Sequence, residues 1–233
     1  MNKEEFINEL KKINIELNEE KLNQLEEYYN LLVTENKKYN LTAITEKEQV
    51  YLKHFYDSLT LSKIINLENK SLCDIGTGAG FPGMVLKIIF PALKVTLIES
   101  NGKKCNFLKL LKEKLNLQNL EIINERAEDY SKKNREIFDI VTSRAVAPLK
   151  HLLEYSIPTV KVDGYYVAMK SNIENEVTNI ENYYKKLNIK LEQKIVFNLP
   201  KEESLRTLLL YKKIEKTNNI YPRKYTEIKK KDI

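Results

Sequence analysis

The chain has 233 residues, of which 42% are hydrophobic and 31% charged, with a formal net charge of +6, as in ordinary globular proteins and unlike disordered or fibrous ones. No stretch approaches the roughly 18–20 apolar residues of a membrane span, and the N-terminus lacks the apolar core of a secretory signal. Cys73 and Cys105 stand at no metal-ligand spacing, so we expect reduced cysteines, no metal and a cytoplasmic protein.

The first 70 residues are predicted to be helical. Apolar side chains recur at helical spacing over 3–13, 19–38 and 46–66, and Asn18 is placed to cap the second helix. This part has 10 Lys and Arg against 13 Asp and Glu, whereas the rest has 29 against 20. The basic surplus favours a polyanionic partner such as RNA, and a general lysine bias would explain it equally well.

Strand and helix patterns alternate after residue 71. The strands are predicted at 72–75, 93–98, 120–124, 137–142, 164–169, 190–197 and 205–213, and the helices at 82–90, 101–116, 148–160 and 174–188. Such alternation indicates a mostly parallel sheet with helices on both faces.

A glycine-rich turn follows the first strand, in the pattern Asp-x-Gly-x-Gly-x-Gly. Gly76, Gly78 and Gly80 allow a sharp turn and a close approach of the backbone to a ligand. The following helix presents free amides to a carboxylate or phosphate. We therefore expect Asp74, Gly76 and Gly78 to belong to a cofactor site.

Two cofactors fit this turn. Gly78, Gly80 and Gly83 also satisfy the G-x-G-x-x-G pattern of NAD-binding oxidoreductases. The acid at position 74, the start of the pattern directly after the strand and the preceding helical segment favour S-adenosylmethionine. A non-catalytic RNA-binding protein with this fold is a third hypothesis, against which the intact turn and Glu99 argue.

Acidic residues at the ends of the next two strands complete the predicted cofactor site. Glu99 closes the second strand, where a carboxylate accepts hydrogen bonds from ribose hydroxyls. Ala127, Glu128 and Asp129 follow the third strand, on the side expected to face adenine. The bland alternatives are a solvated glutamate and the charged start of a short helix.

The end of the fourth strand points to the substrate. The sequence there, Ser143-Arg144, lacks the Asn/Asp-Pro-Pro-aromatic motif of enzymes that methylate exocyclic amines. Enzymes that methylate ring carbon five need a nucleophilic cysteine, and neither Cys73 nor Cys105 stands at a strand end facing the site. The 7-position nitrogen of guanine has a free lone pair, so its methylation needs alignment rather than a general base. Arg144 is the predicted catalytic residue, since an arginine pairs well with the guanine Hoogsteen edge; covering the strand end is its alternative role.

Several segments together resemble one family, the bacterial 16S rRNA 7-methylguanosine methyltransferases (RsmG, GidB). They are Asn40 to Ile44, His54 to Leu59, Asp74 to Gly83, Arg126-Ala127-Glu128, Ser143-Arg144-Ala145, Met169-Lys170 and Tyr221 to Lys224. The resemblance implies a Rossmann-like class I S-adenosylmethionine methyltransferase fold with a seven-stranded sheet. It also implies cofactor contacts from Gly76, Phe81, Ala127, Glu128 and Arg144.

The resemblance further implies 16S rRNA, within the small subunit or an assembly intermediate, as the partner, and we expect a monomer because nothing in the sequence suggests an oligomer. The candidate RNA-binding residues are His54, Asp57, Lys170, Arg223 and Lys224, with a core role as the alternative for the histidine. The C-terminal tail lacks the glycine and proline usual in the family. We expect a helical extension at 1–68, the methyltransferase domain at 69–215 and a basic tail at 216–233.

Overall fold

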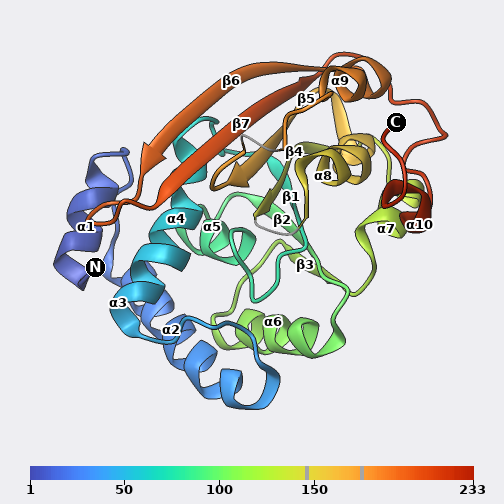
Figure 1. Cartoon of the computed structure of the whole chain (residues 1–233). Helices are drawn as coiled ribbons and strands as arrows, with labels where there is room; N and C mark the ends of the chain where they lie inside the picture. Colours follow the sequence, from blue (N-terminus) through green and yellow to red (C-terminus); the bar gives the residue numbers. More distant parts are fainter. Residues whose placement is uncertain (145–146, 174–175) are drawn as a thin grey trace.

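The fold is built on one seven-stranded sheet, seen in a computed structural model that describes residues 1–144, 147–173 and 176–233 (Figure 1). The strands are β1 (Ser71–Ile75), β2 (Lys94–Ile98), β3 (Leu120–Ile123), β4 (Phe138–Arg144), β5 (Val160–Lys170), β6 (Ile189–Asn198) and β7 (Leu205–Lys213). Their order is β3-β2-β1-β4-β5-β7-β6. The first five strands pair in parallel, and β7 is antiparallel to both of its neighbours. The predicted mostly parallel sheet is confirmed.

Helices cover both faces because alternate strand residues point to opposite sides. Leu72 and Ile140 belong to one hydrophobic cluster, whereas Cys73 and Val141 belong to the other. The helices of the sheet region are α5 (Gly83–Ile89), α6 (Gly102–Lys114), α7 (Ala127–Lys133), α8 (Leu149–Ser156) and α9 (Glu181–Leu187). The order of the strands reverses between β1 and β4, and parallel sheets bind ligands at the carboxyl ends of strands at such a point.

The N-terminal segment forms α1 (Lys3–Lys11), α2 (Glu19–Tyr39) and a third helical run. Asn18 caps α2 as predicted, by accepting a hydrogen bond from the backbone of Lys21. Phe6 and Leu25 share one hydrophobic cluster with Met84 and Leu97 of the sheet region. The extension therefore packs directly on the parallel sheet and its helices, and the boundary at residue 68 stays a prediction.

The third helical run was predicted as one helix over 46–66, and its winding changes along its length. It consists of α3 (Lys47–Val50), a π-helical segment η1 (Tyr51–Tyr56), α4 (Asp57–Leu59) and a 3-10 turn η2 (Thr60–Lys63). All residues of the π segment except Lys53 are buried. Because π turns are rare and often lie at functional sites, the π segment indicates that this helical run contributes to a functional site.

Two predicted helices are shorter in the structure. The one predicted at 148–160 ends at Ser156, and a 3-10 turn η3 (Ile157–Thr159) follows, because Pro158 lacks the N–H that a helix interior needs. The helix predicted at 174–188 starts at residues outside the described part. The described α9 ends before Asn188, which adopts a left-handed conformation with φ of 55°.

The C-terminal tail folds back and forms the short helix α10 (Tyr225–Ile228) beside α7 (Figure 1). Arg223 makes a two-pronged ion pair with Glu154 of α8, whose side chain is fully buried. Ile228 of α10 is also buried. Among the described residues, none of the helices is both long and apolar enough for a membrane span.

Candidate functional site

A cavity of about 1030 Å³ lies at the carboxyl ends of β1, β2, β4 and β5. Its volume is at the upper end of the range of small-molecule sites. Ten of the thirteen candidate residues of the sequence analysis line it: His54, Asp57, Gly76, Gly78, Phe81, Glu99, Ala127, Glu128, Arg144 and Lys170. Asp74, Arg223 and Lys224 do not.

The glycine-rich turn forms the floor of this cavity. Gly76, Gly78 and Gly80 have φ of 69°, 61° and 106°, a region that side chains with a Cβ rarely adopt. The backbone N–H of Gly76 donates to the carbonyl of Ile98 and thereby ties the turn to β2. At Gly76 and Gly78, which line the cavity, the turn therefore presents backbone without a side chain.

Asp74 lies behind the turn instead of in the cavity. Its buried carboxylate accepts hydrogen bonds from the Thr77 hydroxyl (2.6 Å) and the Gly83 backbone (2.8 Å). Its other oxygen, Oδ1, has no partner within the described structure. Asp74 therefore holds the turn against α5, and its expected contact with a cofactor stays a prediction.

Replacing Asp74 with asparagine is expected to change how stability depends on pH. Burial raises the pKa of Asp74 from 3.8 to about 6, so the folded state binds this proton more tightly than the unfolded state. The resulting stabilisation is complete below pH 3.8 and is lost as the pH rises through 6. The free energy of unfolding of Asp74→Asn, relative to the natural chain, should therefore rise by up to about 3 kcal/mol between pH 4 and 7.

Urea unfolding at several pH values measures this difference, and Asp139→Asn is the matched control. Burial raises the pKa of Asp139, but hydrogen bonds from Lys161 and Ser71 outweigh it and lower the pKa to about 2. Its stabilisation is present above pH 3.8, so the control should show a constant offset between pH 4.5 and 7. A constant offset for Asp74→Asn as well would contradict the prediction.

Glu99 stands at the end of β2 and closes the cavity next to the turn. Its Oε2 accepts from the backbone of Gly78 (3.0 Å) and its Oε1 from that of Asn101 (2.8 Å). A carboxylate has about four acceptor positions, so both oxygens keep capacity for ligand hydroxyls. This geometry suits the predicted ribose contact.

The opposite wall is formed by the start of α7 and by α10. Glu128 is buried and accepts a hydrogen bond from Arg126 (2.6 Å). The guanidinium of Arg126 in turn lies 4.3 Å from the ring centre of Tyr225. A flat cation and an aromatic ring that face one ligand cavity are suited to contact a purine base.

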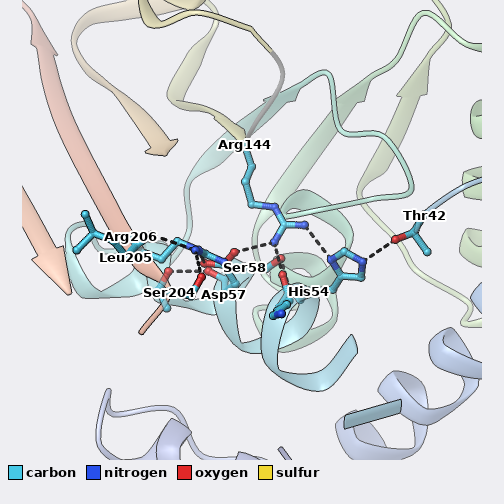
Figure 2. Close-up of polar contacts among 10 residues, drawn as sticks. Thr42, His54, Asp57, Ser58, Arg144, Ser204, Leu205 and Arg206 are labelled. Atoms are coloured by element: carbon cyan, nitrogen blue, oxygen red, sulfur yellow. Dashed lines mark hydrogen bonds and ion pairs between the residues drawn. The ribbon is translucent and has the colours of Figure 1, made fainter. Parts of the chain in front are cut away.

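Arg144 reaches from the end of β4 to the π segment of the third helical run (Figure 2). Its Nη1 donates to the Lys53 carbonyl (2.9 Å) and to Oδ2 of Asp57 (3.2 Å), and its Nη2 donates to Nδ1 of His54 (3.3 Å). An arginine has five N–H groups. Within the described structure two of them keep no protein acceptor, so Arg144 is fixed and still able to donate to a ligand.

Asp57 is the centre of this ion-pair cluster (Figure 2). Its side chain is only 6% exposed, and its Oδ1 accepts from Nε of Arg206 at 3.0 Å. One buried carboxylate thus joins arginines from β4 and β7. Removing either partner of such a buried pair is strongly destabilising, because the remaining charge is left uncompensated.

His54 is neutral in this site. Burial, together with the nearby charge of Arg144, lowers the pKa of His54 to about 3. Its ring stacks on Phe81 with the ring centres 4.3 Å apart. The sequence left a core role open, and the structure places His54 both in the packed interior and on the cavity wall.

Three candidate RNA-binding residues, Arg223, Lys224 and Lys170, are not free cations on the cavity wall. Arg223 is engaged with Glu154, so its head group is turned inward to fix the tail. Lys224 is exposed just before α10, away from the cavity lining. Lys170 lines the cavity, but its side chain is 8% exposed and pairs with Glu176 at 2.8 Å.

The sequence analysis missed several residues that line the cavity, namely Thr42, Lys53, Lys104, Arg126, His151, Tyr155, Arg206, Tyr225 and Lys229. Thr42 and Arg126 stood inside family-like segments, which were usable signals. The others occupy helices, a late strand and the tail, where no local pattern distinguishes a cavity side chain from a surface one. Within the described residues no cluster suited to bind a metal occurs.

Comparison with known proteins gives a consistent family. The family model described as rRNA small subunit methyltransferase G matches residues 21–206. A protein named ribosomal RNA small subunit methyltransferase G from Mycoplasma capricolum is 48% identical over 222 residues, 93% of this chain and 94% of that protein. Its namesake from Acholeplasma laidlawii is 44% identical over 223 residues, 95% of this chain and 96% of that one.

Solved structures share the fold at low sequence identity. The M. jannaschii protein TYW2, in complex with AdoMet, superposes with a TM-score of 0.55 at 18% identity, over 68% of this chain and 77% of that one. A SAM-dependent methyltransferase from Aquifex aeolicus gives 0.52 at 17% identity, over 71% and 93%. The predicted Rossmann-like methyltransferase fold is confirmed.

Proposed function

Because this chain belongs to the rRNA small subunit methyltransferase G family, we propose that it methylates the 7-position nitrogen of a guanine in 16S rRNA. Family membership carries the methylation of rRNA with S-adenosylmethionine. The 7-position nitrogen as the methylated atom and a direct, in-line transfer go beyond family membership and are proposed from the site. We also propose that the enzyme is monomeric and cytoplasmic, and that its substrate is the small ribosomal subunit or an intermediate of its assembly.

The cavity has the donors and acceptors that S-adenosylmethionine requires. The exposed backbone of Gly76 and Gly78 allows close approach, and Glu99 keeps acceptor capacity for hydroxyl groups. Ala127 and Glu128 at the start of α7 would hold the adenine. When bound, S-adenosylmethionine supplies an electrophilic methyl group.

The proposal of the 7-position nitrogen rests on the proton-transfer properties of two cavity side chains, His54 and Arg144. His54 has its pKa lowered to about 3 by burial, and its Nδ1 accepts from Arg144, so it is unsuited to remove a proton at neutral pH. Arg144 donates and never accepts. Such a pair suits a nucleophile that has no proton to lose, as the guanine 7-position nitrogen has none.

Arg144 would then position the base through the neighbouring carbonyl. Its two N–H groups without protein acceptors match the guanine O6, which leaves the lone pair of the ring nitrogen free to attack. The remaining task of the chain is alignment and exclusion of water, which in other systems contributes about 7–11 kcal/mol.

The test is transfer of tritiated methyl groups from S-adenosylmethionine to small subunits that lack the modification, with nucleoside analysis of the product. We expect label in 7-methylguanosine at one site in 16S rRNA. Label in another nucleoside would overturn the proposed nitrogen, and the absence of transfer to subunits or their precursors would overturn the proposed function.

We further propose that the rim of the cavity binds the RNA backbone. Lys104 and Lys229 line the cavity without a carboxylate partner in the described structure, although Lys229 lies 4.8 Å from the ring centre of Tyr225. Lysines without a carboxylate partner beside a ligand cavity are suited to phosphates, because each contact releases counterions.

Replacing Lys229 with glutamate is expected to weaken RNA binding in proportion to the lost phosphate contact. The slope of log affinity against log salt should become shallower by about 0.7–0.9 for one contact. Lys94→Glu is the matched control, because this exposed lysine starts β2 at the opposite edge of the sheet. Equal slopes for Lys229→Glu and the natural chain in filter-binding titrations would leave Lys229 without an RNA role.

A further inference from the structure

Thr42 is a cavity residue whose hydrogen bonds are determined by its neighbours. It follows α2 and is anchored by its backbone N–H, which donates to Oδ1 of Asn36 at 2.9 Å. Its hydroxyl oxygen lies 2.8 Å from Nε2 of His54 and 3.0 Å from the backbone nitrogen of Ile44. The side chain therefore has a fixed place on the cavity wall.

The direction of the hydrogen bonds follows from Arg144. Since a guanidinium only donates, Nδ1 of His54 must accept from Arg144. A neutral imidazole carries one N–H, so the proton of His54 is on Nε2. His54 therefore donates to the hydroxyl oxygen of Thr42, at the end of the chain of contacts in Figure 2.

The hydroxyl of Thr42 is thereby left with only its hydrogen to offer to a further partner. A hydroxyl oxygen has two acceptor positions, and the N–H groups of His54 and Ile44 occupy both. The hydroxyl hydrogen cannot point at either donor, and no protein acceptor faces it within the described structure. Thr42 presents a donor to the cavity.

We propose that Thr42 is a ligand-binding residue, whose hydroxyl donates a hydrogen bond to a carbonyl or carboxylate oxygen of a ligand in the cavity. The proposal rests on the proposed function, under which two such oxygens enter the site. One is the carboxylate of the cofactor's methionine moiety, and the other is a carbonyl of the target base. The fixed donor rejects a ligand that presents an N–H or an apolar group at this point, since a donor would then be left unpaired.

The decisive variants are Thr42→Val, which replaces the hydroxyl by a methyl group of similar size, and Thr42→Ser, which keeps the hydroxyl. Two quantities are measured: the dissociation constant of S-adenosylmethionine by calorimetry, and kcat/KM for 16S rRNA methylation at saturating cofactor. Thr42→Val should worsen one of them by roughly 5- to 150-fold, the effect of one unpaired polar group. Thr42→Ser should stay within about threefold of the natural chain, by the same scale.

The two measurements identify the ligand oxygen. A weaker affinity for S-adenosylmethionine, with no further loss for its decarboxylated analogue, assigns the donor to the carboxylate. A normal affinity with slower transfer assigns it to the base. Unchanged values of both for Thr42→Val, or equal losses for valine and serine, would overturn the proposal, because the hydroxyl would then be irrelevant or only the packing would matter.

Two further variants protect this test. Thr45→Val makes the same change at an exposed threonine outside the cavity lining and should behave as the natural chain. If Thr42→Val unfolds at the assay temperature, Thr42→Ala replaces it, because the smaller side chain admits a water to pair the N–H groups of His54 and Ile44. If the natural chain transfers no methyl group to rRNA, the proposed function fails. The dissociation constants for S-adenosylmethionine then still show whether the Thr42 hydroxyl binds the cofactor.

Discussion

Arg144→Ala is expected to lower methyl transfer by roughly 10²–10³-fold, the effect of losing a fixed donor from an active site. The Arg144 side chain is only 13% exposed, and its guanidinium is held by contacts to Asp57, His54 and the Lys53 carbonyl. Removing it takes away the donors proposed for the base and also the contact that fixes the proton of His54 on Nε2. Steady-state transfer to small subunits measures the loss.

The same change should destabilise the fold, and the two effects need separation. Asp57 would keep only Arg206, and breaking a buried pair costs about 3–5 kcal/mol. Arg144→Lys keeps the charge but not the planar fork, so it should recover part of the stability and little of the transfer.

Lys213→Ala is the matched control for general destabilisation. This buried lysine of β7 donates to the carbonyls of Ile157 and Val160 and lies outside the cavity lining. It should lower the unfolding temperature while the folded enzyme transfers methyl groups at the natural rate. Transfer by Arg144→Ala within tenfold of the natural rate would remove Arg144 from the proposed chemistry.

Gly80→Ala is expected to destabilise the fold more than the same change at Gly78, because position 80 has no room for a side chain. A Cβ built there would stand 2.6 Å from the hydroxyl of Tyr28 and 2.7 Å from Cβ of Met84, at a φ of +106°. The Tyr28 hydroxyl already donates to the Ala79 carbonyl at 2.6 Å and cannot move without breaking that bond. Backbone strain of about 1–2 kcal/mol and overpacking of about 1–3 kcal/mol together predict a loss of about 2–5 kcal/mol.

Gly78→Ala provides the contrast within the same turn. Its φ is +61°, yet no atom lies within 4 Å of an added Cβ, so only the strain of about 1–2 kcal/mol applies. Urea unfolding should give a lower free energy of unfolding for Gly80→Ala than for Gly78→Ala. Cofactor affinity should fall in both, because the turn that presents its backbone to the cavity shifts. Equal stabilities of the two variants would contradict the steric account.

The outcome at the C-terminal tail follows from one buried charge. The sequence presented Arg223 as a basic residue near an atypical tail, and so as a candidate for RNA. In the structure the fully buried Glu154 requires a cation, and Arg223 supplies it with two hydrogen bonds. The tail is thereby held where Tyr225 and Lys229 line the cavity. A basic residue of the tail thus acts as an anchor, and its neighbours Tyr225 and Lys229 face the cavity.

The sequence by itself determined the fold and the position of the cofactor turn, because both depend on local patterns. Alternating apolar strands and amphipathic helices specify a parallel sheet, and Gly76, Gly78 and Gly80 specify a turn with positive φ. Glu99 and Arg144 were predicted because parallel strands end at a common edge. Their family-like order along the chain made the assignment specific.

Only the tertiary structure decided how the side chains pair. The contact of Arg144 with Asp57 joins residues 87 positions apart, and that of Arg206 with Asp57 joins residues 149 apart. No local pattern encodes such distances, since the pairs form only when the third helical run and β7 pack against the end of β4. The buried position of Asp74 and the donor role proposed for Thr42 likewise depend on which neighbours the packing brings within hydrogen-bonding distance.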